Sequence, residues 1–150
     1  MKKSRLLGAA LIVLEVAEVV LFLLCGQTIF SLMGTVTPSG GGEIPVVINQ
    51  QTKVATLTFT FTPRNSGLLA ARVDVGFGVT LKDGSYSAKN MTSVYLPPGA
   101  QASVSLTINV PMEKLQEYTE AKGTLDIYTS IRTLNDLVRL DYNAKTEGGG

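Results

Sequence analysis

The chain has 150 residues, of which 45% are hydrophobic and 17% are charged, and its mean hydropathy is +0.23. This composition is too apolar for a disordered protein, and a net charge of +1 leaves no basic excess for binding nucleic acid. The absence of His and the single Cys exclude Ser-His-Asp and Cys-His catalysis and any His or multi-Cys metal site. We therefore expect a non-enzymatic protein with no catalytic residues, no metal ligands and no cofactor, and no small-molecule substrate is evident.

A long apolar segment begins directly after the basic N-terminus. It runs from Leu6 to Gly34, which is longer than the roughly 20 residues that a helix needs to cross a bilayer core. A cleaved signal peptide would have an apolar region of about 7 to 15 residues and then a small-residue cleavage site. Thr35-Val36-Thr37 matches such a site poorly. The sequence therefore predicts a cytoplasmic N-terminus and one retained transmembrane helix within residues 1–34.

The basic residues around this segment predict its orientation in the cell membrane. Lys2, Lys3 and Arg5 precede it, and the first basic residue after it is Lys53. The positive-inside rule places such an N-terminus in the cytoplasm and the rest of the chain outside.

Two acidic residues interrupt the apolar segment. Glu15 and Glu18 are three residues apart and therefore share a helix face. Carboxylates inside a membrane are costly and rarely face lipid. We predict that they belong to a helix-contact face for other membrane subunits or a second copy, made of Gly8, Leu11, Glu15, Glu18, Phe22 and Cys25. The alternative is a shifted helix that leaves both carboxylates near the cytoplasmic surface.

A change of composition follows the helix. Residues 35–42 read TVTPSGGG, which is typical of a flexible linker, and the glycines at the end of residues 146–150 predict a flexible tail. The intervening residues 43–145 have a common size for one sandwich domain.

Strict alternation of apolar and polar residues dominates residues 43–145 and predicts β-strands. The clearest stretches are 55–62, 71–81 and 102–110, with further strands at 44–49, 91–96, 125–131 and 138–142. Phe59, Phe77 and Leu106 lie on the apolar sides and should be buried. A turn is predicted at Asp83-Gly84, and a short helix after Pro111.

One apolar face per strand predicts two antiparallel sheets packed face to face. About seven strands and one helix are typical of an immunoglobulin-like or fibronectin-III-like β-sandwich. The fold class is therefore mainly β, preceded by a single transmembrane helix.

The order of these features resembles a known family. An alternating strand leads to an Asn-containing turn, and the next long strand ends in Asp-Gly. Leu96-Pro97-Pro98-Gly99, a Ser/Thr-rich strand, Val110-Pro111 with a short helix and Gly123-Thr124-Leu125 follow. This pattern is similar to the late-embryogenesis-abundant type 2, or WHy, domain, over about Val54 to Asn143. The family usually has Asn-Pro-Asn where this chain has residues 63–67. The resemblance implies a fibronectin-III-like sandwich behind a membrane helix and a non-enzymatic accessory or stress-protection role. A generic cell-surface immunoglobulin-like module is the alternative.

Two other features suggest chemistry on the strands. Asn90-Met91-Thr92 fits the N-glycosylation sequon, which makes Asn90 a candidate modification site. Asp74, Asp126 and Asp141 alternate with core residues, and they could meet only if their strands are neighbours.

Two functions remain open from the sequence. The first is a membrane-anchored, extracytoplasmic, non-catalytic accessory or interaction subunit of a membrane assembly, whose partners are the bilayer and other membrane subunits or itself. The second is a pilin-like filament or surface-layer subunit. In that case the short strand with Ile44, Val46, Val47 and Ile48 would add to the sheet of the next copy.

Overall fold

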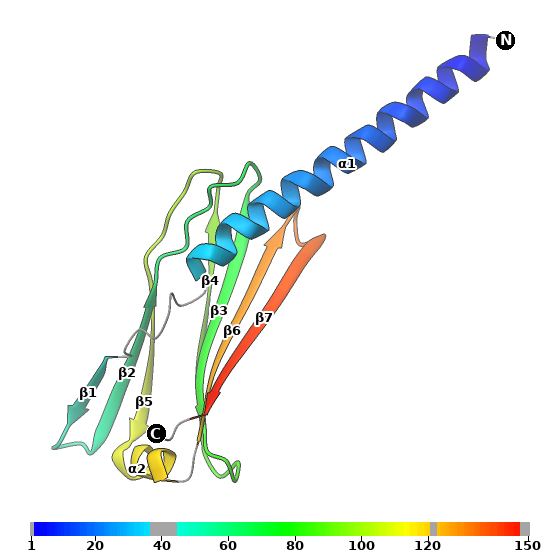
Figure 1. The fold of residues 1–150 in the computed structure, drawn as a ribbon. Helices are drawn as coiled ribbons and strands as arrows, with labels where there is room; N and C mark the ends of the chain where they lie inside the picture. The colour runs from blue at the N-terminus through cyan, green and yellow to red at the C-terminus, as the bar shows by residue number, and fades with distance from the viewer. Residues whose placement is uncertain (1, 37–44, 121–122, 148–150) are drawn as a thin grey trace.

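The computed structural model describes residues 2–36, 45–120 and 123–147. One long helix, α1 (Lys2–Val36), projects from a domain built mainly of strands, residues 45–147, which we call the β domain (Figure 1). Its elements are β1 (Val46–Asn49), β2 (Val54–Phe61), β3 (Ala71–Thr80), β4 (Ser87–Leu96), β5 (Val104–Pro111), α2 (Met112–Glu120), β6 (Thr124–Thr133) and β7 (Val138–Glu147).

The described strands form two antiparallel sheets, as predicted. One has three strands in the order β1-β2-β5, and the other has four in the order β4-β3-β6-β7. The register pairs Phe59 with Leu106 in the first sheet and Phe77 with Ile127 in the second. Because directly paired residues point to the same side of a sheet, the apolar positions of each sheet line up on one face.

These two apolar faces enclose the core of the β domain. Phe59, Phe77 and Leu106 are all buried, which confirms the inside-outside assignment made from the alternation. The rings of Phe59 and Phe77 stack between the sheets with centroids 5.6 Å apart. The fold is thus mainly β and sandwich-like.

The turns and the short helix lie close to the predicted positions. Gly84 has a φ of +71°, which a residue with a side chain rarely adopts, and it closes the predicted turn between β3 and β4. β4 begins at Ser87, four residues before the apolar pattern predicted it. The early start follows from a tight turn, in which the Leu81 N–H donates to the Tyr86 carbonyl at 3.0 Å. α2 follows Pro111 directly.

Helix α1 has two parts with different surroundings. From Lys2 to Leu24, which we call the free half, the described side chains are exposed or nearly so. From Cys25 to Val36, the docked half, one face is buried against the β domain and the opposite face exposes Gln27 and Phe30. The buried face consists of Cys25, Thr28, Leu32 and Val36. These residues recur every three or four positions, so they form a single stripe.

The helix therefore ends two residues beyond the predicted boundary at residue 34, inside the stretch predicted as a linker. The rest of that stretch, residues 37–42, lies outside the described residues. At the other end β7 continues to Glu147, and the predicted tail from residue 148 onward also lies outside them.

Candidate functional site

The predicted helix-contact face lies mostly on the free half of α1. Gly8, Leu11, Glu15, Glu18 and Phe22 are exposed, whereas Cys25 is buried against the β domain. Glu18 precedes Cys25 by seven residues, or about two helical turns, and therefore points to nearly the same side as the buried stripe. The predicted face is thus continuous with the surface by which α1 docks on its own β domain.

The loop between β2 and β3 receives the docked half of α1. Asn65, which is fully buried, organises this loop. Its Nδ2 donates to the carbonyls of Leu69 at 2.8 Å and Leu96 at 2.9 Å, and its Oδ1 accepts the Gly67 N–H at 3.0 Å. A buried amide with its donors and acceptor satisfied fixes the loop in one conformation.

Two helix hydroxyls connect α1 to this loop. Thr28 Oγ1 accepts the Leu69 N–H at 3.2 Å, and Thr35 Oγ1 accepts the Arg64 N–H at 3.1 Å. Gly67 allows the close approach, because a Cβ at that position would collide with both the hydroxyl and the backbone of Thr28. We call these contacts the joint.

The apolar part of the joint lies on the inner face of the four-stranded sheet. Met33 and Val36 border a narrow apolar gap together with Ile131 of β6 and Leu140 of β7. Leu32 is fully buried and belongs to the same core cluster as the strands. The docked half therefore shares its core with the β domain, and the two form one packed unit.

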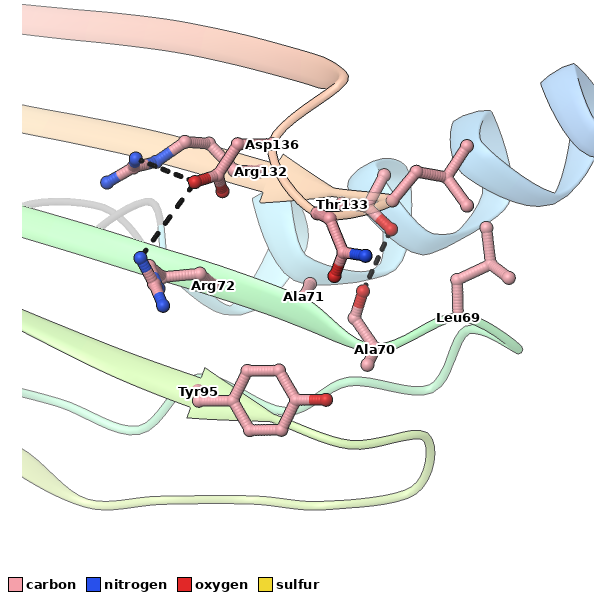
Figure 2. Close-up of a pocket in the computed structure, with 10 residues that line it drawn as sticks. Leu69, Ala70, Ala71, Arg72, Tyr95, Arg132, Thr133 and Asp136 are labelled. Atoms are coloured by element: carbon pink, nitrogen blue, oxygen red, sulfur yellow. Dashed lines mark hydrogen bonds and ion pairs between the residues drawn. The ribbon is translucent and has the colours of Figure 1, made fainter.

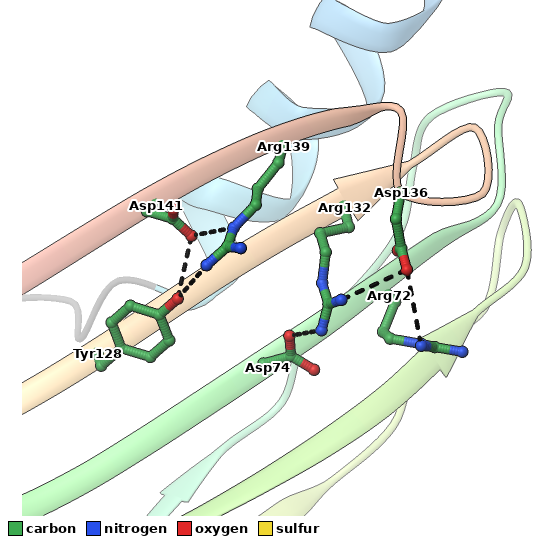
Figure 3. Close-up of polar contacts among 7 residues, drawn as sticks. All are labelled: Arg72, Asp74, Tyr128, Arg132, Asp136, Arg139 and Asp141. Carbon is green, nitrogen blue, oxygen red and sulfur yellow. Dashed lines mark hydrogen bonds and ion pairs between the residues drawn. The ribbon is translucent and has the colours of Figure 1, made fainter.

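The outer face of the same sheet carries a row of ion pairs (Figure 3). Arg132 bonds the carboxylate of Asp74 closely and reaches Asp136 Oδ2 at 3.4 Å. Arg72 lies 3.9 Å from the same Asp136 oxygen. The hydrogen bond to Asp74 raises the pKa of the Arg132 guanidinium above its ordinary value. Arg132 is therefore a fixed cation between two carboxylates.

A second cluster follows on β6 and β7. Arg139 Nε lies 2.8 Å from Asp141 Oδ1, its Nη2 donates to the Tyr128 hydroxyl at 2.8 Å, and that hydroxyl donates to Asp141 at 3.1 Å (Figure 3). The Arg139 hydrogen bond lowers the pKa of the Asp141 carboxyl below its ordinary value. The strands of Asp74, Asp126 and Asp141 are neighbours, and each carboxylate has a cationic partner, which for Asp126 is Lys145 at 3.9 Å.

A hollow of about 400 Å³ lies where this face meets the joint (Figure 2). Arg72, Tyr95 and Arg132 contribute to its lining, and the loop residue Leu69 closes one side. The hydroxyl of Thr133 donates to the Ala70 carbonyl at 2.8 Å, which fastens the end of β6 to the β2–β3 loop.

The turn between β6 and β7 has an unusual backbone. Leu134, Asn135 and Asp136 have φ values of 52°, 52° and 69°. The left-handed conformation costs a non-glycine residue about 1 to 2 kcal/mol, and a bulky Leu rarely adopts it. This strained turn presents Leu137 at its end, with 84% of its surface exposed.

A second hollow of about 430 Å³ lies on the outer face, farther from the helix, and Gly76 and Gly78 of β3 form its base. Lys89 of β4 and Asp126 and Tyr128 of β6 stand beside Gly76 and Gly78. The Oδ1 atom of Asp126 is buried there without a hydrogen-bond partner. Within the described residues, no group of three or more Cys, Asp or Glu side chains is arranged to hold a metal ion.

The two remaining predicted sites lie on edge strands. Asn90 Nδ2 donates to the Thr107 carbonyl of β5 at 3.0 Å, so the candidate modification atom is engaged in the folded chain. In β1, Val46, Val47 and Ile48 are exposed, and among the described strands β1 pairs only with β2. Ile44 lies outside the described residues.

Sequence reasoning missed the joint and the arginine row. The contacts of Arg72, Arg132 and Arg139 depend on how the strands pair, and the sequence of a single strand does not reveal that register. The signal available for the joint was Thr28, a hydroxyl on the same helix stripe as Leu32 and Val36.

No family model matches the chain, and no curated protein matches it. Among solved structures, a putative ApaA protein from Bordetella pertussis matches with a TM-score of 0.46 at 13% identity, covering 71% of this chain and 88% of that one. A protein from Archaeoglobus fulgidus matches with a TM-score of 0.45 at 10% identity, over 70% and 91% of the two chains. A Bacteroides uniformis β-glucuronidase matches with a TM-score of 0.46 at 17% identity, over 71% of this chain but only 12% of its own length. These distant likenesses carry no functional argument.

Proposed function

We propose that this protein is a single-pass membrane protein whose β domain is held outside the cytoplasm by α1 and serves as a non-catalytic interaction subunit. The observation that carries the proposal is the division of α1. It is the one described helix long and apolar enough to cross a membrane, and its docked half is fixed to the β domain. The free half projects away from that domain (Figure 1).

The length of the free half supports a membrane span. From Leu6 to Leu24 an α-helix rises about 28 Å, close to the roughly 30 Å hydrocarbon thickness of a bilayer. The docked half is excluded from this span because one of its faces is buried in protein. We therefore propose that the bilayer covers the upstream residues, with the basic Lys2, Lys3 and Arg5 at the cytoplasmic surface.

Strand order supports a fibronectin-III-like sandwich as the finer fold. Immunoglobulin constant domains place their first, second, fifth and fourth strands in one sheet and the remaining three in the other. Here β1, β2 and β5 form one sheet, and β4 has moved to the edge of β3 in the second. The resemblance to the late-embryogenesis-abundant type 2 domain stays a prediction. The absence of enzymatic activity is also a prediction.

The depth of Glu15 and Glu18 follows from the same register. Glu15 is about 14 Å along the helix from Leu6, near the bilayer midplane, so the alternative of a shifted helix is disfavoured. Two carboxylates at that depth need a neighbour that offers a cation or hydrogen-bond donors. We propose that a second membrane helix supplies them and that this contact makes the protein a subunit of an assembly.

Co-purification in mild detergent tests this function. Replacing Glu15 and Glu18 together with Leu should leave insertion and the melting temperature of the β domain unchanged and remove the associated subunits or the second copy. Leu11→Val, which keeps the carboxylates, is the matched control. A double variant that retains all its partners would contradict the proposal.

Protease added to intact cells tests the orientation and should cleave the β domain. Protection of the β domain until the cells are lysed would reverse the orientation.

The exposed edge of β1 favours the second candidate function, a filament subunit. Val46, Val47 and Ile48 are apolar, exposed and free to pair on one side. Exposed apolar edges promote pairing with another chain. Electron microscopy of native cells distinguishes the two functions, because filaments that disappear on deletion of this chain would favour the second.

A further inference from the structure

We infer that the end of the β domain beside α1 lies on the bilayer surface, with Leu68 and Leu137 inserted among the lipids and the arginines at headgroup level. The inference rests on the proposed membrane span of the free half. In this arrangement the β domain contacts the membrane directly, in addition to the contact made by the spanning helix. The proposed function does not depend on this second contact.

The joint sets the position of this surface relative to the bilayer. Thr28 lies about one helical turn after the start of the docked half, and its Oγ1 accepts the N–H of Leu69. The neighbouring Leu68 therefore lies beside α1 at the point where the helix leaves the β domain. The β6–β7 turn lies at the same end of the domain (Figure 1). A helix that crosses the membrane up to about Leu24 therefore brings both loops to the lipid surface.

The exposed apolar side chains of the loops occur at this end. Leu68 and Leu137 are 63% and 84% exposed, and they are the large hydrophobic side chains exposed in loops and turns among the described residues of the β domain. The other exposed hydrophobic residues of this domain belong to strands or to α2. Single exposed apolar residues are common, but these two lie on loops at the same end of the domain, and the hydrogen bond from Thr133 to the Ala70 carbonyl ties the β2–β3 loop to the end of β6.

The backbone under Leu137 supports the same role. The three left-handed residues 134–136 hold the tip outward, and the Leu137 N–H donates back to the Leu134 carbonyl at 3.2 Å. Strained backbone persists where the surrounding structure maintains it, often at contact sites. Insertion of Leu137 into lipid would remove the cost of exposing its side chain to water, while the strained backbone of residues 134–136 holds it in that outward position.

The basic residues are divided between the two ends of the β domain. All four of its arginines lie in the β2–β3 loop or within two residues of the strand ends next to α1: Arg64, Arg72, Arg132 and Arg139. The described lysines lie toward the opposite end, in the β1–β2 and β3–β4 turns, the first residues of β4, α2 and the last residues of β7: Lys53, Lys82, Lys89, Lys114 and Lys145. Arg72, Arg132 and Arg139 are ion-paired with Asp136, Asp74 and Asp141, so they place polar groups at headgroup level without adding a strong positive charge there. The exposed Tyr95 near Arg72 adds an aromatic ring of the kind enriched at membrane interfaces.

Single-tryptophan scanning in vesicles tests the inference with the full chain, because the native sequence contains no Trp. Leu137→Trp and Leu68→Trp would each be reconstituted in phosphatidylcholine–phosphatidylglycerol vesicles, with and without phospholipid brominated near the headgroup end of the acyl chain. Phe22→Trp is the positive control in the span. Val47→Trp, on a strand paired with the end of β2 far from α1, is the control in water.

We expect both tip variants to emit at shorter wavelength than Val47→Trp and to lose emission in brominated vesicles. Emission from Leu137→Trp that matches Val47→Trp, while Phe22→Trp is quenched, would overturn the inference but leave the anchor intact. Unquenched Phe22→Trp would instead contradict the proposed span. A Leu137→Trp emission that is blue-shifted but unaffected by bromine would mean that protein covers the tip, and would also overturn the lipid contact.

Discussion

The free half of α1 exposes Leu, Val and Phe side chains around its circumference, whereas the docked half buries one stripe in the core of the β domain. Both halves are mainly apolar. The difference lies in what accepts the apolar surface, which is a folded protein for one half and, as we propose, lipid for the other. Hydropathy reports that a helix avoids water, but it does not report which environment replaces water.

The largest expected effect separates the two halves by their contribution to folding. Leu32→Ala should lower the free energy of unfolding by about 2 to 5 kcal/mol, because it removes a fully buried side chain and leaves a cavity. Leu14→Ala, on the exposed free half, should change it by less than about 0.5 kcal/mol. Thermal unfolding of the β domain in detergent, followed by circular dichroism in the β region, measures both. Equal shifts would mean that the halves do not differ.

Much of the β domain follows from its sequence, because alternation is a local signal. Phe59, Phe77 and Leu106 were assigned to the core from period-two patterns alone, and all are buried. The docked half could not be predicted in this way. Residues 6–34 form one apolar run, which predicts a membrane helix over its whole length. The boundary between the span and the joint can be located only when the β2–β3 loop that contacts the helix is known.

The candidate site could be predicted only in part, because it depends on contacts between distant residues. Glu15 and Glu18 stand out as carboxylates in an apolar run. By contrast, the importance of Gly67 arises from Thr28, 39 residues earlier in the chain, and is evident only in three dimensions. The pairing of Arg132 with Asp74 likewise requires the register of β3 and β6.

A smaller effect is expected when the joint is blocked without loss of core volume. Gly67→Ala introduces a Cβ that collides with Thr28 and should cost about 1 to 3 kcal/mol, the usual range for overpacking. Gly26→Ala is the matched control, since nothing lies within 4 Å of a Cβ placed there. Amide hydrogen exchange should show faster exchange at residues 28–36 only in the first variant. Unchanged protection there would disprove the close contact as a determinant of docking.

The two hydroxyls of the joint should differ because their burial differs. Thr28→Val leaves the part-buried N–H of Leu69 without an acceptor and should cost about 1 to 2 kcal/mol. Thr35→Val should cost less than about 0.5 kcal/mol, because water can reach the exposed N–H of Arg64. Both substitutions keep the shape of the side chain, and Thr35→Val also removes the bond from its hydroxyl to the Leu32 carbonyl within the helix. Denaturant unfolding of the two variants should therefore rank Thr28→Val as the less stable, and the reverse order would show that burial does not decide the strength of these bonds.

The smallest effect concerns acid, and it distinguishes the joint from the ion pairs on the opposite face of the sheet. Arg139 lowers the pKa of the folded Asp141 carboxyl, so this pair contributes stability above the ordinary Asp pKa of the unfolded chain and loses it as the pH falls through the depressed folded value. Both groups are exposed, so the loss should be slight. Carboxyl-carbon NMR titration should show the Asp141 pKa rising toward its ordinary value in Arg139→Gln.

The joint contacts of Thr28, Leu32 and Thr35 involve no titrating side chain, so the destabilisation by Leu32→Ala should be the same at neutral and acidic pH. A strong pH dependence of that difference would mean that a carboxylate, and not apolar burial, holds the docked half of the helix.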